Sequence, residues 1–157
     1  MIAVRPATSA DAEALAALRW EFRTSPDRTQ RPCEAEEAFV ARCATWMRGE
    51  LKAGSPWRAW VAEDRDRGSC IVGQIWLQIL GKLPNPVGER RCHGYISNVY
   101  VQPASRGGAG ARLLETALAA AVADDVDRVL LWPSARSVTL YERHGFRRAG
   151  DVMELKL

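Results

Sequence analysis

The feature that most constrains this chain is a glycine-rich turn between an apolar strand and an amphipathic helix. From Tyr95 the sequence reads YISNVYVQPASRGGAGARLLETAL. Glycine lets the backbone come close to a ligand. The unpaired amides in the first turn of a helix, together with the helix dipole, favour an anion. The turn therefore predicts either a phosphate-binding site or a tight connection between strand and helix.

The pattern of apolar residues predicts one α/β domain over residues 1–157, with hairpins first and helical connections later. A hydroxyl cap at Thr8 followed by Asp11 predicts the start of the first helix. Gly145 is expected to end the last helix in a left-handed conformation. The predicted strands cover 2–5, 57–63, 70–80, 95–101, 129–132, 146–149 and 152–157, and helices follow Asp11, surround residues 39–47, and cover 108–123 and 135–143.

Composition excludes several classes of function. The net charge is +3, and arginines are mixed with carboxylates, which argues against nucleic acid as a partner. No apolar run is long enough to span a bilayer, and the first residues do not form a signal peptide, so we expect a cytoplasmic protein without a membrane partner. The 4 cysteines are too widely spaced to indicate a zinc site or a disulfide framework.

Two common phosphate-binding motifs do not fit the turn. A P-loop needs Gly-Lys-Ser/Thr, and no lysine lies near these glycines. A dinucleotide-binding fold places its glycines after the first strand, whereas here they come two-thirds of the way along the chain.

Two segments resemble the motifs of one enzyme family. VYVQPASRGGAGARLLE is similar to the cofactor motif V-x-P-x-x-(R/Q)-x-x-G-x-(G/A) of the GNAT superfamily of N-acetyltransferases, and SVTLYERHGF resembles its later motif A-x-x-L-Y-x-x-x-G-F. The predicted order of elements matches that family over almost the whole chain. The resemblance implies an α/β fold with a mixed sheet of about six to seven strands, about four helices and splayed central strands.

The resemblance also implies where acetyl-CoA binds. The cofactor would lie between the strand ending at Val101 and the strand at 129–132, with pantetheine along the first strand and pyrophosphate on the turn. Arg106 either contacts phosphate or orders the loop, and Ser134 either contacts CoA or caps the next helix. Counting from Arg106 and counting back from Leu113 give registers that differ by one residue. The expected cofactor-binding residues are Val99, Tyr100, Val101, Arg106, Gly107, Gly108, Ala109, Gly110, Ala111 and Ser134.

Acetyl transfer from a thioester to an amine requires a neutral amine, a polarised carbonyl and a proton for the thiolate. The resemblance gives Tyr141 the last role, and a backbone amide near Val99 the second. The general base stays open, because the strand HGYISNVYV contains no carboxylate. His93 and water are alternatives, and Glu34, Glu36 and Glu37 fit better as first-turn acids of a helix.

These features predict a metal-independent acetyltransferase that moves the acetyl group of acetyl-CoA to a primary amine by direct attack. The acceptor is expected to be a small molecule or a peptide, and a homodimer is an open alternative for the assembly. A non-catalytic acyl-CoA-binding sensor or partner-binding module on the same fold is the rival interpretation. The candidate walls of the acceptor pocket are Trp20, Phe22, Arg23, Arg28, Arg31, Trp57 and Trp76.

Overall fold

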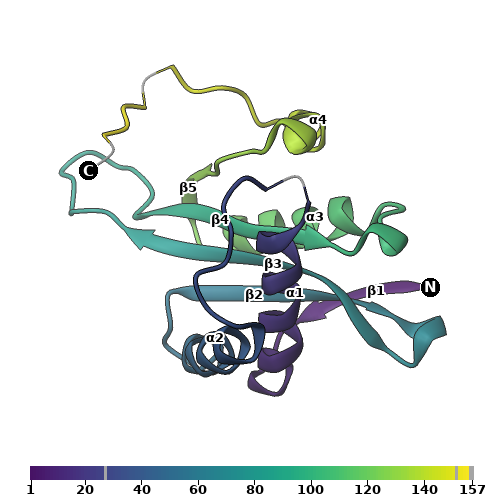
Figure 1. The fold of residues 1–157 in the computed structure, drawn as a ribbon. Helices are drawn as coiled ribbons and strands as arrows, with labels where there is room; N and C mark the ends of the chain where they lie inside the picture. The colour runs from purple at the N-terminus through teal and green to yellow at the C-terminus, as the bar shows by residue number, and fades with distance from the viewer. Residues whose placement is uncertain (27, 151, 156–157) are drawn as a thin grey trace.

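A mixed five-stranded sheet forms the centre of the computed structural model, which describes residues 1–26, 28–150 and 152–155 (Figure 1). The strand order follows the sequence. The first four strands pair antiparallel, and the last pairs parallel to the fourth. The strands are β1 (Ile2–Pro6), β2 (Trp57–Asp64), β3 (Cys70–Gly81), β4 (Cys92–Val101) and β5 (Val126–Leu130).

Helices cover both faces of this sheet. The pair α1 (Ala12–Thr24) and α2 (Glu36–Glu50) packs on one face, and α3 (Ala109–Ala123) packs on the other. Side chains alternate along a strand, so neighbours in β2 enter different cores. Val61 joins the core under α1 and α2, whereas Ala62 joins the core under α3. The short helix α4 (Val138–Arg143) follows β5.

The predicted capping residues start the first helical segment. The backbone amide of Thr8 donates to the Asp11 carboxylate at 2.7 Å, and the amide of Asp11 donates back to the Thr8 carbonyl at 3.0 Å. The guanidinium of Arg5 donates two hydrogen bonds to the same carboxylate, at 2.8 and 2.9 Å. This bidentate pair ties β1 to the start of α1.

The Asp11 carboxylate predicts a pH dependence of stability. The Arg5 hydrogen bonds lower its pKa from 3.8 to about 2, so the folded state holds the charged form more tightly than the unfolded chain does. The corresponding stabilisation, about 2 kcal/mol, is present above about pH 4 and is lost as the pH falls towards 2. We expect Asp11→Asn to have a lower free energy of unfolding than the wild type at pH 7. In urea titrations, the difference between the two free energies should narrow towards pH 3. A difference that stays constant over this range would contradict the assignment.

Gly73 lets β3 and β4 approach each other closely. A Cβ at this position would lie 2.9 Å from Val101 Cγ2 and 3.0 Å from the Tyr100 carbonyl oxygen. Strand backbone cannot move aside easily, so Gly73→Ala should lower the free energy of unfolding by about 1–3 kcal/mol. Chemical denaturation checks this value. The matched control is Gly49→Ala in α2, where a Cβ meets nothing within 4 Å and alanine should stabilise the helix slightly. Equal stability of the two variants would contradict this packing argument.

The α/β fold and the mixed sheet are confirmed, but the expected strand count is wrong. Over the described residues the sheet has five strands rather than six to seven. Residues 146–149, predicted as a strand, form none, and neither do residues 152–155; the end of the second predicted strand lies outside the described residues. Val152 and Met153 are both exposed, so the alternating pattern there has no buried face to fill.

Two strand boundaries also differ from the prediction. β4 begins at Cys92 rather than Tyr95, and β5 covers Val126–Leu130 rather than 129–132. The cause is pairing: Cys92 lies opposite Val126 in the parallel ladder, so both strands start together. The polar break before β5 is also shorter than expected, because the chain turns at Asp125 with a φ of 56°.

Candidate active site

The central strands β4 and β5 stop pairing halfway along β4. Their ladder runs from Cys92 opposite Val126 to Tyr95 opposite Leu130, where β5 ends. From Ile96 to Val101, β4 therefore has β3 on one side and, within the part of the chain that the structure describes, no strand on the other. The expected splay of the central strands is thus present. It leaves a backbone edge that an extended ligand could join as an extra strand.

A β-bulge interrupts β4 on this open stretch. Trp76 lies opposite Ser97, whereas Gln74 lies opposite Tyr100, so β4 carries one residue more than β3 between these pairs. Asn98 sits in the bulge with a φ of 53°, in the left-handed region. A bulge redirects backbone groups out of the ladder. It can therefore turn an amide towards the gap between the strands.

The glycine turn leads from this edge into α3. Gly108 precedes the helix with a φ of 90°, and no side chain caps the first amides of α3. The first turn carries no acidic residue that could neutralise the helix dipole. Arg106 donates from Nε to the Val101 carbonyl oxygen at 3.3 Å, so its side chain orders the loop. The turn at residues 106–111 thus brings the uncapped start of α3 directly after the open strand edge.

The second motif packs onto the start of α3. A Cβ at Gly110 would lie 3.8 Å from Leu140 Cδ2 and 4.0 Å from Val101 Cγ2, so α4 lies beside both the helix and the strand end. The neighbouring Tyr141 is 7% exposed, and its ring centroid lies 5.6 Å from that of Phe146. Gly145 ends α4 with a φ of 84°, as predicted.

Burial governs the acidity of Tyr141. Desolvation raises the pKa of its hydroxyl above 10, and the neighbouring Ser137 side chain offsets part of this shift. The phenol therefore stays protonated at neutral pH. Such a group can donate a proton to a strong base that forms beside it.

Ser134 lies on the exposed approach to α4. It occupies the capping position of the short 3-10 turn Ala135–Ser137, but its hydroxyl contacts the Ser137 hydroxyl at 3.0 Å and makes no capping bond to the backbone. The structure thus places Ser134 in the turn before Tyr141. Its hydroxyl is close to the surface and bonded locally.

Of the candidate bases, His93 is remote from the bulge. It lies opposite Arg128 in the ladder between β4 and β5, near the start of β4, and its Nδ1 lies 4.0 Å from the Asp127 carboxylate. Asn98 follows five residues later, about 16 Å along an extended strand. His93 therefore does not lie near the open half of β4.

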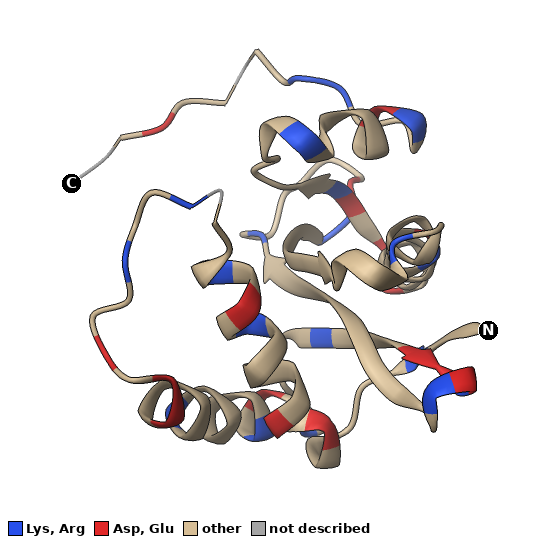
Figure 2. Ribbon diagram, turned by 45° about the vertical axis from the view of Figure 1, so that its right-hand side comes forward, with Lys and Arg blue, Asp and Glu red and all other residues tan. Residues whose placement is uncertain are grey.

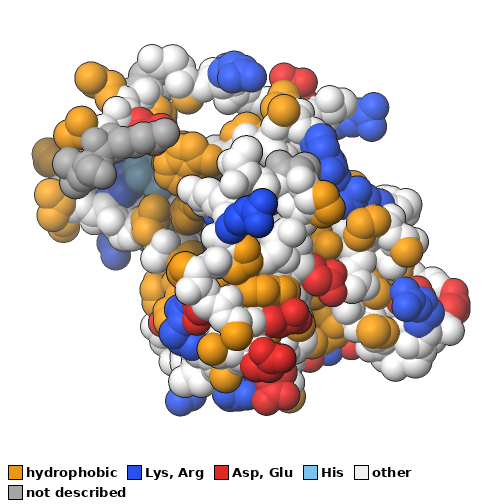
Figure 3. All heavy atoms as spheres, viewed as in Figure 1, with side chains coloured by type: hydrophobic (Ala, Val, Ile, Leu, Met, Phe, Trp, Pro, Cys, Tyr) orange, Lys and Arg blue, Asp and Glu red, His pale blue; other side chains and the backbone are white. Residues whose placement is uncertain are grey.

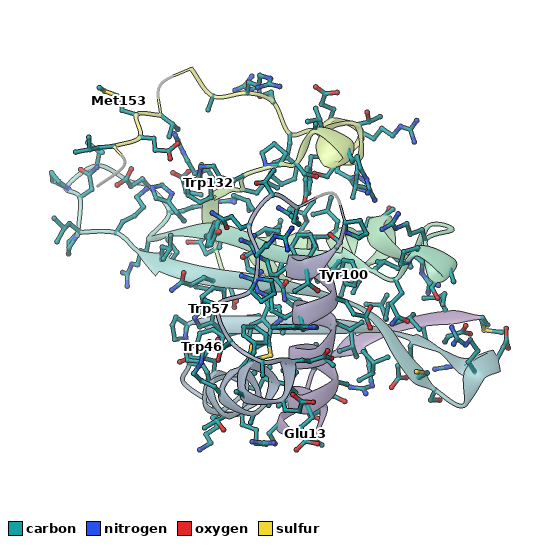
Figure 4. The ribbon with its side chains drawn as sticks, in the orientation of Figure 1. Glu13, Trp46, Trp57, Tyr100, Trp132 and Met153 are labelled. Carbon is teal, nitrogen blue, oxygen red and sulfur yellow. The ribbon has the colours of Figure 1, made fainter. Side chains whose placement is uncertain are left out.

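Glu21 is a carboxylate at this site that the sequence analysis missed. Tyr100 donates its hydroxyl to Glu21 at 3.3 Å, and the Gln102 amide donates to both carboxylate oxygens at 3.0 and 3.1 Å. Glu21 belongs to α1, and Figure 4 shows Tyr100 beside the upper end of that helix. No local pattern in the sequence pairs this turn of α1 with the end of β4.

The predicted acceptor-pocket walls divide into two groups. Trp20, Phe22, Arg23 and Arg28 lie at or just after the C-terminal end of α1. Phe22 stacks at 5.3 Å from Tyr100, and Arg28 lies 4.5 Å over the Phe22 ring. Trp76 is only 2% exposed and belongs to the core under α1 and α2, where it contacts Trp57. Of the two roles open to this candidate, Trp76 therefore has that of a core residue. Arg31 is exposed on the loop.

A hollow of about 1270 Å³ lies between β5, α4 and the C-terminal segment. Trp132 and Tyr141 line it, but no residue of β4 or of the glycine turn does. Figure 1 shows the C-terminal segment arching away from the sheet above this region.

Among the described residues, no cluster of three or more His, Cys, Asp or Glu side chains could hold a metal ion. Within the same residues, no helix combines the length and apolar composition that crossing a bilayer requires.

Solved structures with the same fold cover nearly the whole chain. A predicted acetyltransferase from Clostridium acetobutylicum, crystallised with acetyl-CoA, has a TM-score of 0.79 and 22% identity over 99% of this chain and 96% of its own. A GCN5-related N-acetyltransferase from Ralstonia eutropha has a TM-score of 0.75 and 23% identity, covering 99% of each chain. Glucosamine-6-phosphate N-acetyltransferase from Arabidopsis thaliana has a TM-score of 0.72 and 19% identity, covering 99% of this chain and 98% of its own.

At these identities the solved structures establish the fold alone. No curated protein matches the sequence significantly. The family model for the acetyltransferase (GNAT) family matches residues 13–146, which include the splayed strand, the glycine turn and the tyrosine helix. The chain therefore belongs to the acetyltransferase (GNAT) family.

Proposed function

We propose that the protein is an acetyl-CoA-dependent N-acetyltransferase that acetylates a primary amine by direct attack in the cytoplasm. The observation that carries this proposal is the open edge of β4 from Ile96 to Val101, which leads straight into uncapped amides at the start of α3. An unpaired strand edge suits the amides of pantetheine, and an uncapped helix start suits a diphosphate. Both features lie on one continuous stretch of chain.

In this proposal the backbone of Val99, Tyr100 and Val101 binds the pantetheine arm. The amides from Arg106 to Ala111 hold the diphosphate, with Ser134 as a further contact. Acetyl-CoA supplies an acetyl group activated as a thioester. The side chain of Arg106 stays on the Val101 carbonyl and keeps the turn in shape for binding.

The chain supplies three elements of catalysis at the reacting carbonyl. A backbone amide of the bulge near Val99 stabilises the oxygen as the amine attacks. Tyr141 gives its proton to the thiolate as the C–S bond breaks, and its raised pKa keeps that proton available. Glu21 or solvent takes the proton that the amine loses.

Release of free thiol from acetyl-CoA across a panel of primary amines tests this function. An acetyltransferase gives amine-dependent release, with one acetylated product for each thiol. Calorimetric titration with acetyl-CoA should be done on the same protein sample. Tight binding of acetyl-CoA without turnover of any amine would instead support the non-catalytic acyl-CoA-binding module.

A further inference from the structure

Arg19 is a partly buried cation with a neutral hydrogen-bond partner. Arg5, Arg42 and Arg48 each reach a carboxylate, namely Asp11, Glu34 and Glu13. Arg19 is half-buried under the α1–β4 contact, and its side chain reaches only the neutral amide oxygen of Asn98, at 3.1 Å. Within the described part of the chain, no carboxylate pairs with it. A guanidinium carries five N–H donors, so most of its binding capacity is unused.

The surroundings of Arg19 disfavour its positive charge. Burial lowers its pKa, and the positive charges of Arg23 and Arg28 lower it further. Figure 2 shows basic segments on either side of an acidic segment at the upper end of α1, and further basic segments along the loop that follows it. In Figure 3, which views this face, acidic and basic side chains lie side by side over the lower part of the molecule. A partly buried cation without a counter-ion is costly, and a bound anion would offset the cost.

This cation lies beside the predicted reaction centre. Asn98, its hydrogen-bond partner, is the left-handed residue of the β4 bulge. Tyr95 lies three residues before Asn98 on β4, and its ring meets the Trp132 ring edge-on at 5.1 Å. Figure 4 shows Trp132 at the end of β5, where the strands separate. An acceptor entering here would thus meet a guanidinium and two aromatic rings.

We propose, building on the acetyltransferase function above, that the acceptor is a small amine carrying an anionic group, which Arg19 binds in the active site. The guanidinium touches the bulge itself, so only a few bonds can separate the anion from the reacting amine. An α-amino carboxylate and a 2-aminoethyl phosphate both meet this condition. The planar guanidinium fork binds either oxyanion with two hydrogen bonds.

Matched pairs of amines test this inference. One pair is phenylalanine and phenylalaninamide, which differ in the carboxylate; the other is 2-aminoethyl phosphate and 2-aminoethanol, which differ in the phosphate. For each compound, kcat and KM are measured by thiol release, and Kd is measured by calorimetry on protein saturated with CoA. The proteins are wild type, Arg19→Gln, Arg19→Lys and the control Arg48→Gln, which removes the same charge from the surface of α2.

In at least one pair, the KM and Kd of the wild type should be about tenfold to a hundredfold lower for the anionic member. This is the effect expected of a charge-assisted hydrogen bond. The pair that discriminates identifies carboxylate or phosphate. Arg19→Gln should abolish the preference mainly through KM and Kd, Arg19→Lys should restore part of it, and Arg48→Gln should keep it. The melting temperature of each variant shows that it is folded.

Two results would overturn the inference. One is a wild-type protein that discriminates in neither pair, by turnover or by binding. The other is Arg19→Gln lowering kcat equally for both members of a pair, which would mean that Arg19 only supports the bulge. Acetylation of amines without discrimination refutes this inference and leaves the acetyltransferase function intact. Discrimination in binding without acetylation of any amine refutes the acetyltransferase function and leaves the anion-binding role of Arg19 intact.

Discussion

Tyr141→Phe should lower kcat by about a hundredfold or more while leaving the Kd for acetyl-CoA almost unchanged. The hydroxyl is the only group removed, and the buried ring keeps its place against Phe146. Without that proton donor, the thiolate must leave unprotonated or take a proton from water. Steady-state thiol release and calorimetric titration with acetyl-CoA measure the two quantities on the same sample.

The melting temperature serves as the control for this variant. An unchanged melting temperature assigns the loss of kcat to chemistry rather than to packing of α4. A variant that keeps kcat within threefold of the wild type would exclude Tyr141 as the proton donor. A parallel loss of acetyl-CoA affinity would show instead that the hydroxyl shapes the binding site.

Gly108→Ala should weaken acetyl-CoA binding by about fivefold to thirtyfold. Its φ of 90° is costly for any residue with a Cβ, by about 1–2 kcal/mol, although the space around it is open. The turn relieves this strain by moving, and the amides of Ala109 and Gly110 then no longer point at one diphosphate. Calorimetric titration with acetyl-CoA gives the change in Kd.

Gly107→Ala is the matched control for this prediction. It makes the same substitution one residue earlier, where the backbone has no positive φ and a Cβ meets nothing within 4 Å. We expect its affinity to stay close to that of the wild type. Equal loss in both variants would mean that bulk in the loop, rather than the shape of the turn at residue 108, controls binding.

The parts of the fold set by short-range chemistry could be predicted from the sequence. The Thr8–Asp11 capping box and the left-handed Gly145 depend on residues within three or four positions of each other. The glycine turn before α3 is of the same kind. Each has a mechanism that can be read from neighbouring residue types.

The parts set by contacts between distant segments could not be predicted. The start of β5 depends on its pairing with Cys92, and the segment 146–149, predicted as a strand, has no strand beside it among the described residues. Glu21 and Arg19 reach the active-site region because α1 crosses β4, some eighty residues along the chain. Periodicity places a residue on one face of its own helix, but it does not identify the strand that this face meets.

A crystal structure of the protein with acetyl-CoA would locate the bound cofactor. We expect pantetheine beside Val99 to Val101, the diphosphate on the amides of residues 106–111, and the thioester sulfur within hydrogen-bond reach of the Tyr141 hydroxyl. Acetyl-CoA bound instead in the hollow between β5, α4 and the C-terminal segment, or a sulfur far from that hydroxyl, would contradict this expectation.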